Sequence, residues 1–184
     1  MSLALDPEAA LASLRTLHEA IDREVDLLNE EHAERLRCGP GCSACCLDGL
    51  TVEAVEAERI CRAHPDLLRD TEPHPIGACA FLDGEGSCRV YADRPSLCRS
   101  QGLPLRFLLE DEHDEVVERR DICPLNLEGG PPLEELVEEA CWLLGPAELR
   151  LAAIADAFST EGKRERVALR GLFERDRPSN RESR

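Results

Sequence analysis

Aromatic residues are scarce in this sequence: Phe, Trp and Tyr together make up only 3% of its 184 residues. A core without large rings must be built from the aliphatic side chains of Leu, Ala, Val and Ile. Such a core gains from metal crosslinks, because the binding energy of a structural metal site is also folding energy. At this length we expect one core, with room for a small appended subdomain.

The sequence also lacks the signals of export and of membrane insertion. Its first residues, MSLALDPEAALASL, have no basic start and no long apolar stretch, and Asp6-Pro7 comes early, so they do not read as a secretory signal. No stretch approaches the roughly 18 apolar residues that a membrane span needs. We therefore expect a cytoplasmic protein. In a reducing compartment, clustered cysteines are more often metal ligands or catalytic thiols than disulfides.

Positive charge is in short supply as well. The 22 Lys and Arg residues stand against 38 Asp and Glu residues, which gives a formal net charge of −16. An acidic chain is repelled by nucleic-acid phosphates and by anionic lipid headgroups. The composition thus argues against nucleic acid and membrane as partners.

Cysteine, by contrast, is abundant, with ten residues in the chain. Four of them lie in the run Cys-Gly-Pro-Gly-Cys-Ser-Ala-Cys-Cys, where Gly and Pro let a loop turn several sulfurs onto one point. Four-thiolate coordination of Zn²⁺ or of an iron–sulfur cluster requires such convergence. We expect eight cysteines to be metal ligands: Cys38, Cys42, Cys45, Cys46, Cys79, Cys88, Cys98 and Cys123.

The other two cysteines are predicted to be core residues. Cys61 and Cys141 each fall on an apolar stripe with helical spacing. Without these two, eight cysteines remain, which is enough for two metal centres with four thiolate ligands each. Adjacent side chains point in different directions, so Cys45 and Cys46 are expected to serve different centres. Our preferred partition places Cys38, Cys42 and Cys45 with one later cysteine, although a single centre with unliganded thiols also fits the spacing.

The spacing favours an iron–sulfur cluster over zinc. Structural zinc sites usually show paired C-x2-C knuckles, and this chain has only one such pair, Cys42 and Cys45. The irregular C-x3-C-x2-C run is more typical of cluster ligands. Four thiolates around either metal leave a negative unit that nearby cations stabilise. Arg37, Arg89 and Arg99 each adjoin one of the cysteines, and Arg94 lies four positions before Cys98.

Other chemistry is less well supported. C-x3-C-x2-C is also the motif of radical S-adenosylmethionine enzymes, but the β/α repeats of their barrel are missing. No HExxH-like element points to a zinc hydrolase, and no catalytic constellation is evident. His32 and His74 are considered as extra ligands, yet a polar role is the simpler interpretation for both. The run of ionisable residues at 110–115 is interpreted as a solvated hairpin tip.

The apolar pattern predicts a mostly α fold with small β-hairpins. A long helix should start at Pro7, with one face formed by Leu11, Leu14, His18, Ile21, Val25, Leu28 and His32. That face could form a coiled-coil dimer, but packing within the chain is favoured because two positions are His. Further helices are expected over 51–63, 137–144, 147–158 and 163–173, and hairpins over 79–91 and 105–119.

We predict four segments along the chain. Residues 1–37 form the long helix, 38–128 a small metal-stapled cysteine-rich domain, and 129–174 the C-terminal helices that flank it. Residues 175–184 form a basic tail whose composition is typical of disorder.

The order of these motifs resembles a known family. C-x3-C-x2-C-C is followed by C-x-F-L, a second cysteine after a Gly-rich turn, V-Y-x-x-R-P-x-x-C-R and a late C-P. This order over residues 38 to 124 is similar to the YkgJ-type cysteine-cluster family, a zinc- or iron-chelating domain with eight cysteines. The resemblance implies metal chelation by the eight cysteines named above and leaves the physiological reaction open.

Two classes of function follow. The first is a small metalloprotein whose iron–sulfur cluster or zinc, in one or two sites, is the working part in redox chemistry, metal handling or support of a modification enzyme. The second is a structural-zinc adaptor whose helices bind a protein partner. Either class is compatible with a monomer or a homodimer.

Overall fold

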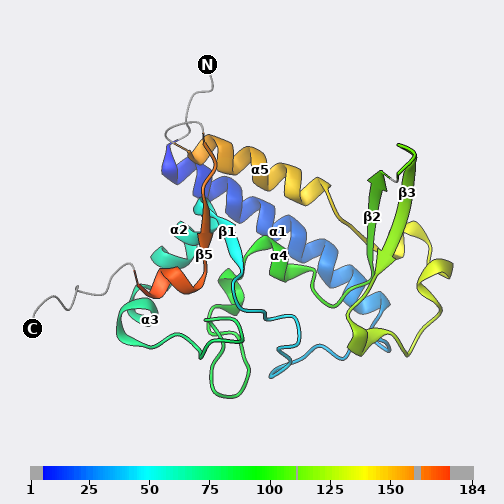
Figure 1. Cartoon of the computed structure of the whole chain (residues 1–184), viewed down its shortest axis with the longest axis horizontal. Helices are drawn as coiled ribbons and strands as arrows, with labels where there is room; N and C mark the ends of the chain where they lie inside the picture. Colours follow the sequence, from blue (N-terminus) through cyan, green and yellow to red (C-terminus); the bar gives the residue numbers. More distant parts are fainter. Residues whose placement is uncertain (1–5, 111, 160–162, 175–184) are drawn as a thin grey trace, which may run out of the picture. The chain divides into compact units, whose positions relative to one another are not determined.

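The computed structural model describes residues 6–110, 112–159 and 163–174. It is mostly helical with two small sheets, as predicted (Figure 1). The chain divides into two compact units. Of the described residues, unit 1 contains Asp6, Pro40–Arg94, 155–159 and 163–174, and unit 2 contains Pro7–Gly39, 95–110 and 112–154. The four predicted segments stay a prediction, and the tail 175–184 lies outside the described residues.

Unit 2 is organised around the long helix α1, Pro7–Glu31. The predicted apolar face is buried along its whole length, and His32 just beyond the helix is buried too. Its middle and C-terminal turns form a core with two residues from distant segments, Leu103 and Trp142. The stripe is therefore used for packing within the chain, because side chains spaced three and four apart share one helix face.

A hairpin and several short helical turns complete unit 2. Strands β2 and β3 pair antiparallel, with Leu105 opposite Asp121, and β2 also pairs in parallel with β4. The hairpin confirms the one predicted over 105–119. The elements are α4 (Ser96–Arg99), β2 (Leu105–Glu110), β3 (Val116–Asp121), η2 (Pro124–Asn126), η3 (Leu133–Glu135), η4 (Glu138–Ala140) and β4 (Trp142–Leu143). Helix α5 (Pro146–Phe158) begins in unit 2 and ends in unit 1.

Unit 1 joins segments that are far apart in the sequence. Strand β1 (Thr51–Glu53) pairs antiparallel with β5 (Arg166–Ala168), as the two neighbouring arrows labelled β1 and β5 show in Figure 1. Its core contains Val52, Val55, Ile60, Phe81 and Leu172, all nearly fully buried. The other elements are α2 (Ala54–Ala63), α3 (Pro65–Asp70), η1 (Tyr91–Asp93) and η5 (Arg170–Phe173).

Three predicted helices differ from the structure. The helix expected over 51–63 begins only at Ala54, because β-branched Thr51 and Val52 pair with β5 instead. The helix expected over 137–144 is wrong: η4 is followed by β4, whose Trp142 N–H donates to Pro104 O at 2.8 Å. Long-range strand pairing also replaces the helix expected over 163–173 with β5 and η5.

The predictions of the first hairpin and of the helix over 147–158 have different outcomes. The hairpin over 79–91 is reduced to one bridge, between Leu82 and Cys88. Helix α5 agrees with the prediction over 147–158. No helix in the described part of the chain is both long and apolar enough to cross a bilayer.

Candidate metal site

The structure distributes the eight predicted ligands over both units. Unit 1 holds Cys42, Cys45, Cys46, Cys79 and Cys88, and unit 2 holds the other three. All ten cysteines of the chain are free thiols. We describe the two groups separately.

In unit 1 a tight turn carries Cys45 and Cys46. The Cys46 N–H donates to Ser43 O at 2.9 Å, and the Leu47 N–H donates to Cys45 O at 3.0 Å. This turn brings the two thiols within hydrogen-bonding reach of each other. This proximity favours a shared group for Cys45 and Cys46, because successive side chains of a turn do not alternate as they do in a strand; their expected assignment to different centres stays a prediction.

Two further contacts bring Cys79 and Cys88 toward this turn. The Cys79 N–H donates to Cys46 O at 2.9 Å. Cys88 follows a turn over 83–87 in which the Asp83 carboxylate accepts the Ser87 N–H at 2.8 Å. Within that turn, Gly86 (φ +81°) approaches Gly41 so closely that a Cβ atom would lie 3.1 Å from Gly41 O. Glycine is thus strongly favoured at position 86, because larger residues rarely adopt this φ and a Cβ atom would push against Gly41 O.

The thiols of this group influence one another electrostatically. A hydrogen bond with Cys46 lowers the pKa of Cys45 to about 6. The same hydrogen bond raises the pKa of Cys46, and burial and the negative charges of Cys45, Cys79 and Cys88 raise it further. Burial is the main cause that raises the pKa of Cys79 and of Cys88. The charges of Cys45, Cys79 and Cys88 thus all act on Cys46, so three other thiols contribute to the surroundings of Cys46.

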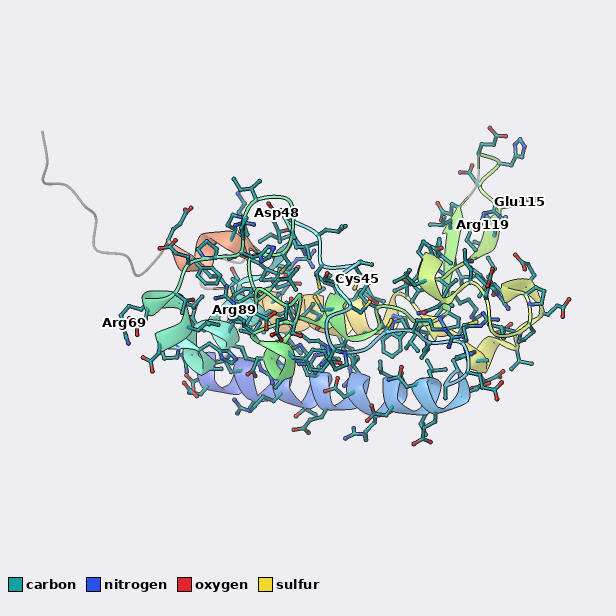
Figure 2. All side chains as sticks on the ribbon, turned by 90° about the horizontal axis from the view of Figure 1, so that it is seen from below. Cys45, Asp48, Arg69, Arg89, Glu115 and Arg119 are labelled. Atoms are coloured by element: carbon teal, nitrogen blue, oxygen red, sulfur yellow. The ribbon has the colours of Figure 1, made fainter. Side chains whose placement is uncertain are left out.

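Arg89 supplies one positive charge beside this group. Its side chain donates to Ala80 O at 2.8 Å and to Thr71 Oγ1 at 2.9 Å, and it lies over the Phe173 ring at 5.3 Å. Its charge favours the thiolate forms of Cys79 and Cys88. Figure 2 labels Cys45, Asp48 and Arg89 among the densely packed side chains of the cysteine loops.

Arg170, which our sequence reasoning did not single out, supplies the second charge. Its guanidinium donates to Asp48 Oδ1 at 2.9 Å, to His74 O at 2.6 Å and to Ala78 O at 2.9 Å. It thereby connects the segment after Cys46 to the segment before Cys79. The sequence signal was an arginine among apolar residues in 167–173, a segment that was expected to be helical.

In unit 2, Asn126 connects the segments that carry cysteines. Its side chain is fully buried; Oδ1 accepts the Arg37 N–H at 2.8 Å, and Nδ2 donates to Gly102 O at 2.8 Å. Nδ2 also lies 3.5 Å from Cys38 Sγ, and the Asn126 N–H donates to Cys123 O at 2.8 Å. Asn126 was not predicted, because a single Asn two residues after Cys-Pro gives no distinctive signal.

The backbone at Gly102 also approaches Cys38 closely. Gly102 has φ +97°, and a Cβ atom there would lie 2.5 Å from Cys38 Sγ. Gly102 follows Cys98 by four positions, and Cys98 is held in the short helix α4 by a hydrogen bond from its N–H to Pro95 O at 2.9 Å. The segments of Cys38, Cys98 and Cys123 are therefore tied together around Asn126.

The histidine, the core cysteines and the arginines singled out in the sequence have different roles in the structure. His32 Nε2 lies 2.7 Å from Ala140 O, which accounts for its burial. Cys141 is buried as predicted, although not on a helix, and Cys61 is only partly buried. Arg94 contributes to the field at Cys88, whereas Arg99 forms an ion pair with Asp22 at 2.5 Å.

Within the described ranges, no three His, Cys, Asp or Glu side chains are already arranged to hold a metal ion. The donor chemistry nevertheless fits a thiophilic metal: four coupled thiols, two nearby guanidinium groups and no competing disulfide.

The comparison with known families points to the same segment. Residues 37–124 match the family model CxxCxxCC, described as "Putative zinc- or iron-chelating domain". The name of the family contains the C-x2-C-C run of Cys42, Cys45 and Cys46, while the first spacing here is longer by one residue. This agrees with the resemblance stated from the motifs. No curated protein and no solved structure matches this chain.

Proposed function

Because the chain carries a domain of the CxxCxxCC family over residues 37–124, we propose that it binds an iron–sulfur cluster or Zn²⁺ through two separate groups of thiolates. The first group comprises Cys45, Cys46, Cys79 and Cys88, with Cys42 beside them. The second group comprises Cys38, Cys98 and Cys123. The observation that supports this proposal is the turn that carries Cys45 and Cys46, to which the Cys79 N–H donates at Cys46 O over 2.9 Å, with the charges of Cys79 and Cys88 acting on Cys46.

The surroundings of the first group suit a thiolate-bound cluster and Zn²⁺ alike, and the irregular C-x3-C-x2-C spacing is what favours the iron–sulfur cluster. Four thiolates around a cluster leave an excess of negative charge, which hydrogen bonds and nearby cations stabilise. Arg89 and Arg170 both lie close enough to lower the pKa of Cys79 against the effect of burial. A bound cluster would supply one-electron redox chemistry, and the residues of this chain would hold and tune it. The working role is then electron transfer, metal handling or support of a modification enzyme.

The deciding experiment is metal and sulfide analysis of protein purified without oxygen. We expect brown protein with broad absorption near ~400 nm and with iron and acid-labile sulfide bound. Colourless protein with stoichiometric zinc would reject the iron–sulfur assignment. It would favour a structural-zinc adaptor, the second candidate, which the surface groove of unit 2 described below supports.

The partition into two groups can be tested with single substitutions. Cys88→Ser should remove metal from the first group and leave the second loaded, whereas Cys123→Ser should do the opposite. Each variant should then retain a fraction of the wild-type metal, and the double variant should retain none. Complete loss of metal in either single variant would instead indicate one shared centre.

A further inference from the structure

A groove on unit 2 runs beside the C-terminal half of α1 and has no role in the metal proposal. It encloses about 490 Å³ and adjoins a smaller hollow of about 210 Å³, with which it shares Glu24, Trp142 and Leu143. Apolar side chains line it from two directions: Leu27 and Leu28 come from α1, and Trp142 and Leu143 from β4. Leu27 is 67% exposed, so the apolar surface is available to a partner.

The rim of the groove is acidic. Glu24 and Glu31 line it from α1, and Glu138 and Glu139 line it from η4. The positive groups are fewer: Arg106, already paired with Glu118 and Glu138 at 2.9 and 2.8 Å, and Arg150 in the smaller hollow. Carboxylates around an apolar floor attract a cationic ligand with apolar anchors and repel an anionic one.

We propose that this groove binds a basic amphipathic helix of another protein. Along α1, the two hollows extend from Leu17 to Glu31, which corresponds to about 21 Å of helix rise. That length accommodates about four turns of a partner helix, whose apolar side chains at i, i+3, i+4 and i+7 would contact exposed Leu27 and half-buried Leu143. Lys or Arg residues on its flanks would pair with the glutamates of the rim.

The charge of the molecule disfavours two other occupants. A second copy of the chain would bring another net charge of −16 to an acidic rim. An RNA or DNA strand would bring phosphates to the same carboxylates. A positively charged peptide is the occupant for which both the floor and the rim are complementary.

Trp142 is the only tryptophan in the chain and lies in both hollows, so its fluorescence reports directly on occupancy. The probe is a 14-residue amphipathic peptide of Leu and Lys, titrated into the full-length protein as purified. We expect a saturable change in Trp142 emission. A peptide with Glu in place of every Lys, and a Leu/Lys peptide with scrambled order, should bind at least about tenfold more weakly.

Matched variants distinguish peptide binding in the groove from a general effect of the protein's net charge. Glu24→Lys with Glu31→Lys should weaken peptide binding about tenfold or more, because both carboxylates line the groove. Glu112→Lys with Glu115→Lys changes the net charge equally at the exposed hairpin tip and should alter binding less than about threefold. Both pairs are exposed, so thermal unfolding should be unchanged.

Three results would overturn the proposal. The first is that both double variants weaken peptide binding equally, and the second is that the Glu peptide binds as tightly as the Lys peptide. The third is that the protein sediments as a dimer, which dissociates when Glu24 and Glu31 are both changed to Lys. The last result would assign the groove to a second copy of the chain. Because no cysteine ligand is altered, metal content measured in the same samples keeps this test independent of the metal proposal.

Discussion

At the scale of single residues, Arg170 holds two cysteine-bearing segments through one guanidinium group. It bonds to Asp48 on one side and to the carbonyl groups of His74 and Ala78 on the other. Arginine suits this position because its planar fork presents several N–H donors in fixed directions. A lysine would keep the charge but could not satisfy the same set of acceptors.

We therefore predict that Arg170→Gln weakens metal binding by the first group about 10- to 100-fold, the range typical of residues that support metal ligands. Arg170→Lys should recover part of this loss, because it restores the charge beside Cys79. Competition with a chelator measures both effects. The matched control is Arg164→Gln, since Arg164 is an exposed arginine of the same segment paired with Asp156. Equal weakening in the control would show that charge alone, without the hydrogen bonds, is responsible.

A second residue-scale prediction separates ligand cysteines from core cysteines. Cys46→Ser should abolish metal binding by the first group, because a hydroxyl is a poor ligand for a thiophilic metal. Cys141→Ser should leave metal content unchanged and cost ~1 to 3 kcal/mol in the free energy of unfolding, from burying an imperfectly paired hydroxyl. Metal analysis and urea denaturation of both variants provide the check. Full metal content in Cys46→Ser would remove the central residue of the proposed group.

At the scale of elements, the turn over 83–87 depends on one carboxylate. Asp83 accepts the N–H groups of Ser87 and Glu85 at 2.8 and 2.9 Å, and these hydrogen bonds lower its pKa. The depressed pKa means that ionised Asp83 favours the folded turn. This stabilisation is fully present above the unfolded pKa of roughly 3.9 and is lost as the pH falls through the lower folded value.

We predict that acid loosens this turn in metal-free protein, with faster amide exchange at Glu85 and Ser87 below about pH 4 after correction for intrinsic rates. Asp83→Asn should show the faster exchange already at neutral pH and should lose most of the pH dependence. Glu72→Gln is a suitable control outside the turn. Unchanged protection in Asp83→Asn would mean that the backbone alone holds the turn.

Elements with strong local signals could be predicted from the sequence. The spacing of Leu14, Ile21 and Val25 predicts α1 because a single helix face satisfies it. Residues 137–144 carry a similar spacing, yet Trp142 and Leu143 form a strand because Leu105 and Arg106, distant in the sequence, offer unpaired backbone groups. Periodicity cannot reveal such a partner. Periodicity could not reveal the role of Arg170 either, because its hydrogen-bond acceptors lie at residue 48 and at residues 74–78, far away in the sequence.

The sequence predicts which residues are candidate ligands, because they are cysteines, but it does not predict which of these cysteines lie in the same group. Cysteine in Gly- and Pro-containing loops indicates metal chemistry whatever the fold. Which cysteines meet depends on turns such as the one that joins Cys45 to Cys46, and on the long-range bond between Cys79 and Cys46. The bond between Cys79 and Cys46 joins positions 33 residues apart, so the spacing of the cysteines does not reveal it.

At the scale of the whole molecule, metal should stabilise loops more than helices. Chelation at low pH should increase amide exchange over 38–50 and 72–90, where few large apolar side chains are buried. Helix α1 and strand β2 should keep most of their protection, because they contribute to the apolar core of unit 2. Loss of protection in α1 to the same extent as in the loops would show that the metal stabilises the entire chain.

The pairing of β1 with β5 has a consequence for the order of events during folding. Arg170 lies 122 positions after Asp48, and the Arg166 side chain bonds to Thr51 across 115 positions. Contacts at such separations form late, because the entropy of closing the intervening loop must be overcome first. Throughout that interval the thiols of unit 1 are open to sulfenic acid formation and wrong disulfides. The time needed to close this loop, rather than the affinity of the finished site, then sets how long the nascent protein needs a reducing environment.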